Sequence, residues 1–124
     1  MDFALSPEQA AIQKTFHDFA DREIRPRAQA LDEHPAFPRD LFERVGELGF
    51  FGMRYPEPHG SGADVVSCAL AVEELAWGSL SVAAACTMQS LMGTWFVFRF
   101  GSAEQHERLF RPALAGKKIG AICM

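Results

Sequence analysis

Residues 81–100 read SVAAACTMQSLMGTWFVFRF, a run that is long and apolar enough for a helix buried among other helices. A run of about 20 apolar residues would also suffice to cross a bilayer. Polar or charged side chains interrupt this run, however, at Thr87, Gln89, Ser90, Thr94 and Arg99. Because polar groups are costly in lipid, we predict the central helix of a bundle and no membrane span.

Helix start and stop signals lie on both sides of this run. Two stretches, SPEQ at 6–9 and SAEQ at 102–105, match the capping box, and Asp64 is a suitable N-cap. Pro26 lacks a backbone donor and predicts a kink in the first helix. The expected helices cover residues 6–31, 38–48, 64–78, 81–100 and 102–115. Together they predict an all-α fold, an up-and-down helical bundle of about five helices.

The last residues, 112–124, read PALAGKKIGAICM. Gly116 suits the position just past a helix end, and the two lysines after it suit the negative end of the helix. The apolar run that follows is strand-like, and a lone strand leaves its backbone groups unsatisfied. We therefore expect a helical domain at 1–117 and, at 118–124, the first strand of a β-domain that is otherwise absent. On this interpretation the chain is the front part of a larger protein.

Composition limits the function classes. The 124 residues are 48% hydrophobic, enough for one domain with a core, and carry a net charge of −4. Nucleic acid is disfavoured as a partner, because phosphates require a basic face. Cys68, Cys86 and Cys123 share no metal-like spacing, and the four histidines are isolated, so we expect no metal site. An odd number of cysteines without a secretory segment predicts reduced thiols in a cytoplasmic protein.

Periodicity and spacing alone predict no catalytic chemistry. Glu73 and Glu74 are adjacent, so on a helix they point about 100° apart and cannot act as a paired acid and base. The stretch GSG at 60–62 lacks the preceding strand and the third glycine of a phosphate-binding motif. The residues by themselves indicate a helical domain.

Three stretches together resemble the N-terminal helical domain of the acyl-CoA dehydrogenase family. The first is FALSPEQ at 3–9 with EIRP at 23–26, and the second is EELA at 73–76 with Gly78. The third and most specific is FGSAEQHERLFRPALAG at 100–116 with IGA at 119–121. The resemblance covers the whole chain in order.

This resemblance implies an FAD enzyme that removes two hydrogens across the α–β bond of an acyl-CoA thioester. A carboxylate takes the α-proton while the flavin N5 takes the β-hydride, and in most members this base is a glutamate of the C-terminal domain. We therefore expect no catalytic residue here, and a chain that alone is inactive and retains no FAD. The family also implies a homo-oligomer, tetrameric in the family, and an electron-transfer partner, while oxidases and monooxygenases share the scaffold.

Residue by residue, the resemblance implies few contacts with the cofactor. Ile122, Cys123 and Met124 match the first positions of the flavin-contacting segment. An aromatic residue is common in the family at the position of Ile122, so this chain departs from the pattern there. The loop PEPHG at 56–60 departs as well, because the family often has Pro-Glu-Glu-Tyr-Gly-Gly at this place.

Ala83, Ala84 and Thr87 match positions that line the acyl-chain pocket in straight-chain members. Small residues also allow close helix packing, so both interpretations stay open. Two other functions remain possible: a non-catalytic helical subunit that completes a site with a partner chain, and a stand-alone helical binding module. The expected strand at the end of the chain favours the enzyme domain, because an independent module should end outside an element.

Overall fold

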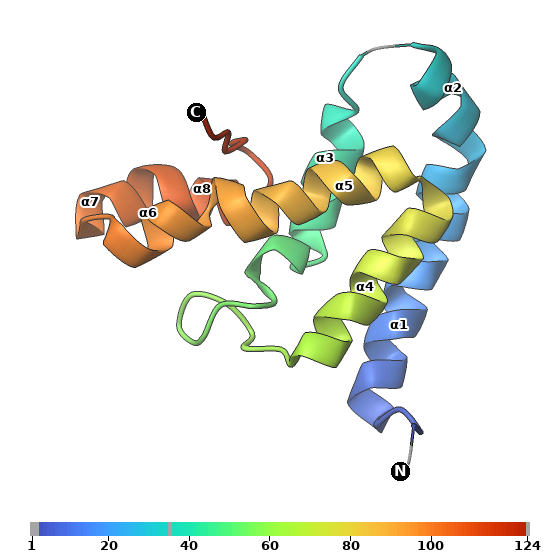
Figure 1. The fold of residues 1–124 in the computed structure, drawn as a ribbon, viewed down its shortest axis with the longest axis horizontal. Helices are drawn as coiled ribbons and strands as arrows, with labels where there is room; N and C mark the ends of the chain where they lie inside the picture. The colour runs from blue at the N-terminus through green and yellow to red at the C-terminus, as the bar shows by residue number, and fades with distance from the viewer. Residues whose placement is uncertain (1–2, 35, 124) are drawn as a thin grey trace.

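A computed structural model of the chain describes residues 3–34 and 36–123. Within these ranges every regular element is helical, and the elements group into five helical runs, which confirms the predicted all-α bundle (Figure 1). In chain order the elements are α1 (Pro7–Phe19), η1 (Ala20–Ile24), η2 (Arg25–Arg27), α2 (Ala28–Glu33), α3 (Arg39–Glu47), η3 (Phe50–Gly52), α4 (Val65–Gly78), α5 (Leu80–Met88), η4 (Gln89–Gly93), α6 (Trp95–Phe100), α7 (Ala103–Gln105), η5 (His106–Phe110) and α8 (Arg111–Leu114). Of these, η1, η4 and η5 are π-helical turns, and η2 and η3 are 3-10 turns.

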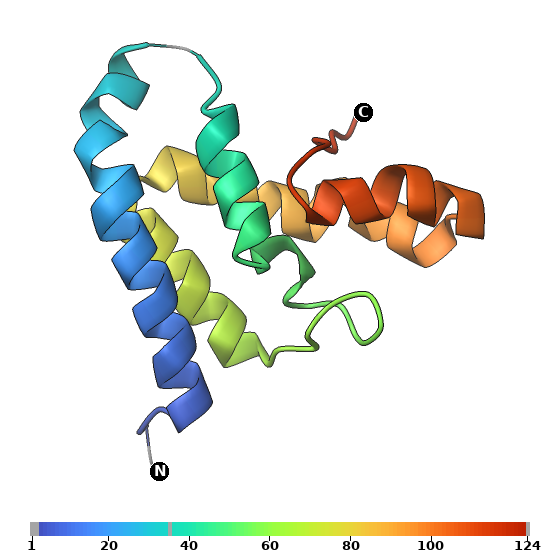
Figure 2. The same ribbon diagram turned by 180° about the vertical axis from the view of Figure 1, so that it is seen from behind.

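Along the chain, the three helices α1, α3 and α4 alternate in direction. α1 and α4 lie side by side and run the same way, while α3 runs the opposite way (Figures 1 and 2). α5 crosses this group and packs against both α3 and α4. Beyond η4, the helix α6 and the run from α7 to α8 form a smaller group at the far end of α5. The junction at η4 therefore joins the two groups.

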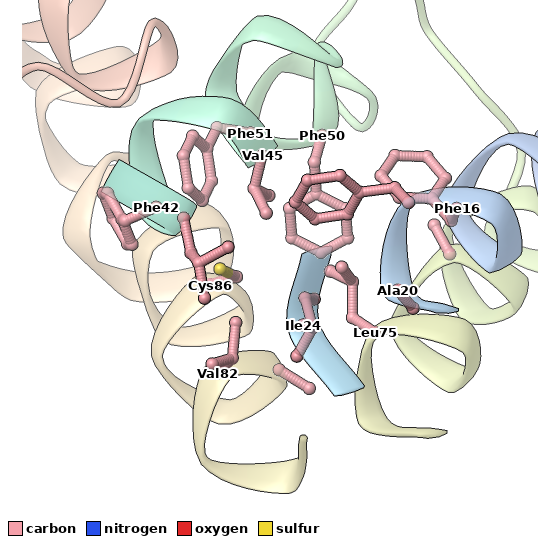
Figure 3. Close-up of a cluster of buried hydrophobic side chains, with 14 of the residues drawn as sticks. Phe16, Ala20, Ile24, Phe42, Val45, Phe50, Phe51, Leu75, Val82 and Cys86 are labelled. Carbon is pink, nitrogen blue, oxygen red and sulfur yellow. The ribbon is translucent and has the colours of Figure 1, made fainter. Parts of the chain in front are cut away.

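One apolar core fills the space between α1, α3, α4 and α5 (Figure 3). Phe51 is fully buried in it, with its ring 4.7 Å from that of Phe42 and 5.8 Å from that of Phe50. Side chains from the other helices close the core, among them Phe16, Ile24, Val45, Leu75, Val82 and Cys86. The core thus fixes α5, the helix on which the predicted acyl-pocket residues lie.

The predicted caps are present. Ser6 and Ser102 each form a complete capping box, with Gln9 and Gln105 respectively. Asp64 caps α4, because its Oδ1 accepts the backbone N–H of Ser67 at 2.8 Å. The Gln9 amide also donates to the Asp64 carboxylate, at 3.3 and 3.4 Å to its two oxygens. The starts of α1 and α4 are thereby linked.

Asp64 should make the stability of the chain depend on pH. The backbone N–H of Ser67 is the main cause that holds the pKa of Asp64 below its ordinary value. Stabilisation from such a carboxylate is present above the unfolded-state pKa, about 4, and is lost as pH falls through the lower folded-state pKa. We expect Asp64→Ala to lower the melting temperature at pH 7, and the difference from the unchanged chain to shrink below about pH 4.

Asp64→Asn is the matched control, because asparagine caps a helix without a titrating group. Melting temperatures of the three proteins measured from pH 7 to pH 3 test the prediction. A difference between Asp64→Ala and the unchanged chain that is as large at pH 3 as at pH 7 would refute it.

The run from Leu80 to Phe100 lies where the sequence predicts it, but its burial is one-sided. The buried side consists of Val82, Ala83, Cys86, Gln89, Ser90 and Thr94. The opposite side carries exposed apolar residues, so the prediction that this helix is buried among others is wrong for that side. We call it the open α5–α6 face, and it consists of Leu80, Met88, Leu91, Met92, Phe96 and Phe100. Exposed apolar surface of this kind marks a place where other protein or a ligand packs.

By length and composition alone, Leu80–Phe100 would also suffice to cross a membrane. The core helix of a protein in water passes the same test, and a third of the most apolar window of this helix is buried within the chain. The buried side holds hydrogen-bonded polar side chains such as Gln89 and Thr94. The length and composition are therefore weak evidence for a membrane span.

The end of the helical part agrees with the sequence, but the strand does not form. Gly116 follows α8 with φ +74, the left-handed conformation expected of a glycine after a helix. Residues 119–123 have no regular secondary structure, because a strand needs ladder hydrogen bonds to a neighbour and no described segment supplies them. Met124 lies outside the described residues. The assignment of 118–124 to a second domain stays a prediction.

Candidate functional site

Gln89 links the central helical run to the C-terminal segment. Its side chain is 2% exposed, and its Nε2 donates to the carbonyl oxygens of Ala113 at 3.0 Å and Lys118 at 2.8 Å. Its Oε1 accepts the backbone N–H of Gly120 at 2.8 Å. Both amide hydrogens and the amide oxygen are therefore engaged. A single side chain fixes the last turn of α8 and the segment that follows it.

Two glycines let this segment cross η4 at backbone distance. A Cβ atom on Gly120 would collide with the carbonyl oxygen of Gly93, and one on Gly93 would lie 2.9 Å from the carbonyl oxygen of Gly120. Any larger residue at Gly120 would push the segment away from the helix. The π-turn closes here as well, because the backbone N–H of Thr94 donates to the Gln89 carbonyl at 3.1 Å. Its wider turn places Gln89 and Gly93 together under the segment.

Beyond Gly120 the chain carries the predicted flavin-contacting residues to the surface. Ile122 is 38% exposed, and Cys123 is an exposed free thiol. Residues 121–123 make no hydrogen bond to any other described residue, so their backbone donors and acceptors are open to a ligand. Met124, the third predicted contact, lies outside the described part of the chain. Contact of these residues with a flavin stays a prediction.

The three predicted acyl-pocket residues span about 100° of the circumference of α5, since consecutive helical residues are turned by that angle. Ala83 is buried in the core, where its small size serves helix packing. Ala84 is exposed, and Thr87 lies between these two directions. Only Thr87 lines a described groove, and contact of the three with an acyl chain stays a prediction.

This groove lies between α4 and the α5–η4 run and encloses about 630 Å³. Its walls are mainly apolar, with Val65 and Val72 from α4 and Leu91 from η4. Thr87 lines it, and the Thr87 hydroxyl is itself buried, with no hydrogen-bond partner among the described residues. Arg54 lies at its edge, with its guanidinium 5.0 Å from the centre of the Trp95 ring. A groove of this size and composition suits a mostly apolar group with one polar atom.

Glu74 and the two less exposed cysteines have structural surroundings. Glu74 accepts from Gln13 at 3.1 Å and lies 2.7 Å from His17 Nδ1, so it ties α4 to α1, whereas its neighbour Glu73 is exposed. Burial raises the pKa of the Cys86 thiol to about 12 and also raises the pKa of Cys68. Neither the buried Cys86 nor the half-buried Cys68 is therefore a nucleophile at neutral pH.

The loop at 56–60 packs against the smaller helical group. The ring of His59 lies 5.5 Å from the rings of His106 and Phe98. His106 Nε2 in turn donates to the carbonyl oxygens of Val97 and Phe98, at 3.0 and 3.1 Å, and so satisfies the last turn of α6. His59, which with Pro58 departs from the pattern that the sequence comparison with the family predicts for this loop, thus belongs to an aromatic cluster.

Comparison with known proteins gives one consistent result. The family model for "Acyl-CoA dehydrogenase, N-terminal domain" matches residues 6–117. Benzylmalonyl-CoA dehydrogenase of Aromatoleum aromaticum is 58% identical over 125 residues, which cover 100% of this chain and 33% of that protein. The chain therefore spans about a third of the length of the curated relatives it matches.

Solved structures agree with the sequence comparison. Butyryl-CoA dehydrogenase from Megasphaera elsdenii is 31% identical with a TM-score of 0.82, over 96% of this chain and 32% of that one. A glutaryl-CoA dehydrogenase from Mycobacterium smegmatis in complex with FADH2 is 27% identical with a TM-score of 0.85, over 93% of this chain and 30% of that one. The helical arrangement described above is thus the one that these structures contain.

Proposed function

Since the chain belongs to the acyl-CoA dehydrogenase family, as an N-terminal domain of that family, we propose that it serves in an FAD-dependent acyl-CoA dehydrogenase. The domain contributes the wall of the acyl pocket and one edge of the flavin site. The observation that carries this proposal is the 58% identity to benzylmalonyl-CoA dehydrogenase along the whole chain. The reaction removes one hydrogen from the α-carbon and one from the β-carbon of an acyl-CoA thioester.

The C-terminal segment fits an edge of a flavin site. It offers exposed apolar surface at Ile122 and unengaged backbone groups at 121–123, which suits a ring that is flat, apolar on its faces and polar on its rim. Bound FAD supplies the hydride acceptor of the proposed reaction. This chain supplies the supporting backbone, and we assign the carboxylate base to another domain, as in most members of the family.

The acyl group is placed along α5. Ala84 on the exposed side and Thr87 in the groove leave room beside the helix. The open α5–α6 face supports the same proposal, because it provides apolar surface for the other domains and the substrate to cover. The name of the 58% identical relative makes an acyl-CoA with a benzyl and a malonyl group the first substrate to test.

We place the protein in the cytoplasm as a homo-oligomer that passes its electrons to an electron-transferring flavoprotein. Three free cysteines among the described residues are compatible with a reducing compartment. A structure from a study of the electron transferring flavoprotein of Acidaminococcus fermentans is 30% identical to the chain, with a TM-score of 0.84. That likeness supports a flavoprotein as the electron acceptor.

A chimera tests the proposed function. Residues 1–124 would replace the aligned first third of the benzylmalonyl-CoA dehydrogenase of Aromatoleum aromaticum. We expect the purified chimera to hold FAD at one per subunit and to oxidise benzylmalonyl-CoA with an artificial electron acceptor. The same enzyme without its first third is the baseline. A chimera that is soluble and folded but has no more FAD or activity than this baseline would overturn the proposal.

A further inference from the structure

We propose that Gln89 is a positioning residue for the flavin edge, because its amide fixes the segment that carries Ile122 and Cys123. The inference rests on the proposed function and extends it to a residue in the middle of the central helical run. Gln89 lies 31 residues before Gly120 in the sequence, yet the two share a hydrogen bond of 2.8 Å. The side chain acts through the segment, without contact to a substrate.

The amide is suited to this task because it donates and accepts at once. Its donors engage the carbonyl oxygens of Ala113 and Lys118, and its oxygen engages the Gly120 N–H. A glutamate would keep the acceptor, lose both donors and place a charge at a site that is almost fully buried. An asparagine would be one methylene too short to reach the same three groups. Glutamine is therefore the side chain that matches the site.

Few other contacts hold the segment. The backbone N–H groups of Lys117 and Lys118 both donate to the Pro112 carbonyl, at 2.9 and 3.3 Å, and these bonds end where the segment leaves α8. From residue 119 onward, a single hydrogen bond among the described residues holds the segment, and it runs from the Gly120 N–H to Gln89 Oε1. Close contact of Gly120 with Gly93 adds packing at the same point. Loss of the amide should therefore release residues 119–123 together.

Two variants of the FAD-bound chimera described above test the inference. One changes the Gln89 side chain, and the other changes the segment that it holds. Gln89→Met keeps the volume and removes all three hydrogen bonds. Gly120→Ala leaves Gln89 and the core intact and pushes the segment off η4. We expect each to raise the dissociation constant for FAD by about tenfold or more. A segment that is no longer held on η4 must be ordered when FAD binds, and this ordering lowers the affinity. Amide hydrogen exchange at position 120 should accelerate in Gln89→Met by a similar factor.

Ile24→Ala is the matched control, since Ile24 is fully buried in the core, in the turn η1 that packs against α4. It should lower the melting temperature and leave both FAD affinity and exchange at Gly120 unchanged. If both test variants bind FAD as tightly as this control, the role of Gln89 is refuted while the proposed function stands. If the unsubstituted chimera itself retains no FAD, the proposed function fails and the positioning role fails with it.

Discussion

Replacement of Phe51 with alanine should lower the free energy of unfolding by about 3–5 kcal/mol, the range for truncation of a buried aromatic side chain. Phe51 is fully buried, and its ring meets those of Phe42 and Phe50 at the point where α3 and η3 face α5. The cavity would lie within the core, where the rings of Phe42 and Phe50 would lose their partner. Urea unfolding should show the loss as a lower midpoint, and the melting temperature should fall by about 10–20 °C.

Phe3→Ala is the matched control, because Phe3 is the same residue type at 83% exposure. Its effect should stay within about 0.5 kcal/mol, as is usual for surface substitutions. An equal loss of stability in the two variants would mean that Phe51 is not packed in the core. The comparison needs no flavin and tests the fold independently of the proposed function.

Replacement of Ala84 with phenylalanine should reduce catalytic efficiency toward long acyl-CoA substrates by roughly 30- to 200-fold in an enzyme that contains this domain. The ring would exclude three or four methylenes, each worth about 0.8 kcal/mol, or ~2–3 kcal/mol in total. Short acyl-CoA substrates that do not reach this depth should be largely spared. The ratio of kcat/KM for a long and a short acyl-CoA is the measurement.

The structure sharpens this test. Ala84 is exposed in the described chain, so a phenylalanine there should not overpack the helical core, whereas one at the buried Ala83 would. Ala10→Phe is the matched control, because Ala10 is an exposed alanine near the start of α1, the end of that helix that lies away from α5. An unchanged ratio in Ala84→Phe, together with a lowered melting temperature, would show that Ala84 packs against protein and does not line the acyl pocket.

Most of the fold could be predicted because its signals are local. Ser6 and Ser102 cap the starts of helices through hydrogen bonds to residues three positions away, and Asp64 does the same. The left-handed Gly116 is likewise a property of a few neighbouring residues. Signals of this kind are contained in four or five consecutive residues, so the helix positions follow from the sequence with small shifts at their ends.

Features that depend on distant residues could not be predicted. Gln89 is visible in the sequence as a polar residue in an apolar run, but its three partners lie 24 to 31 residues away. The one-sided burial of the run from Leu80 to Phe100 also escapes the pattern, because apolar residues lie on both sides of this helix. The different surroundings of Ala83 and Ala84 depend on how α5 is rotated against α3 and α4.

The π-turn η4 has a consequence for how this chain can change length. A π-turn holds one residue more than the α-helical turn it replaces, so a single deletion within Gln89–Gly93 would restore regular α-helix. All residues after the deletion would then turn by about 100° relative to α5. Phe98, whose ring lies 4.8 Å from that of Tyr55, would leave that contact, and Gln89 would lose its alignment with Gly93. Insertions and deletions should therefore be selected against within these five residues.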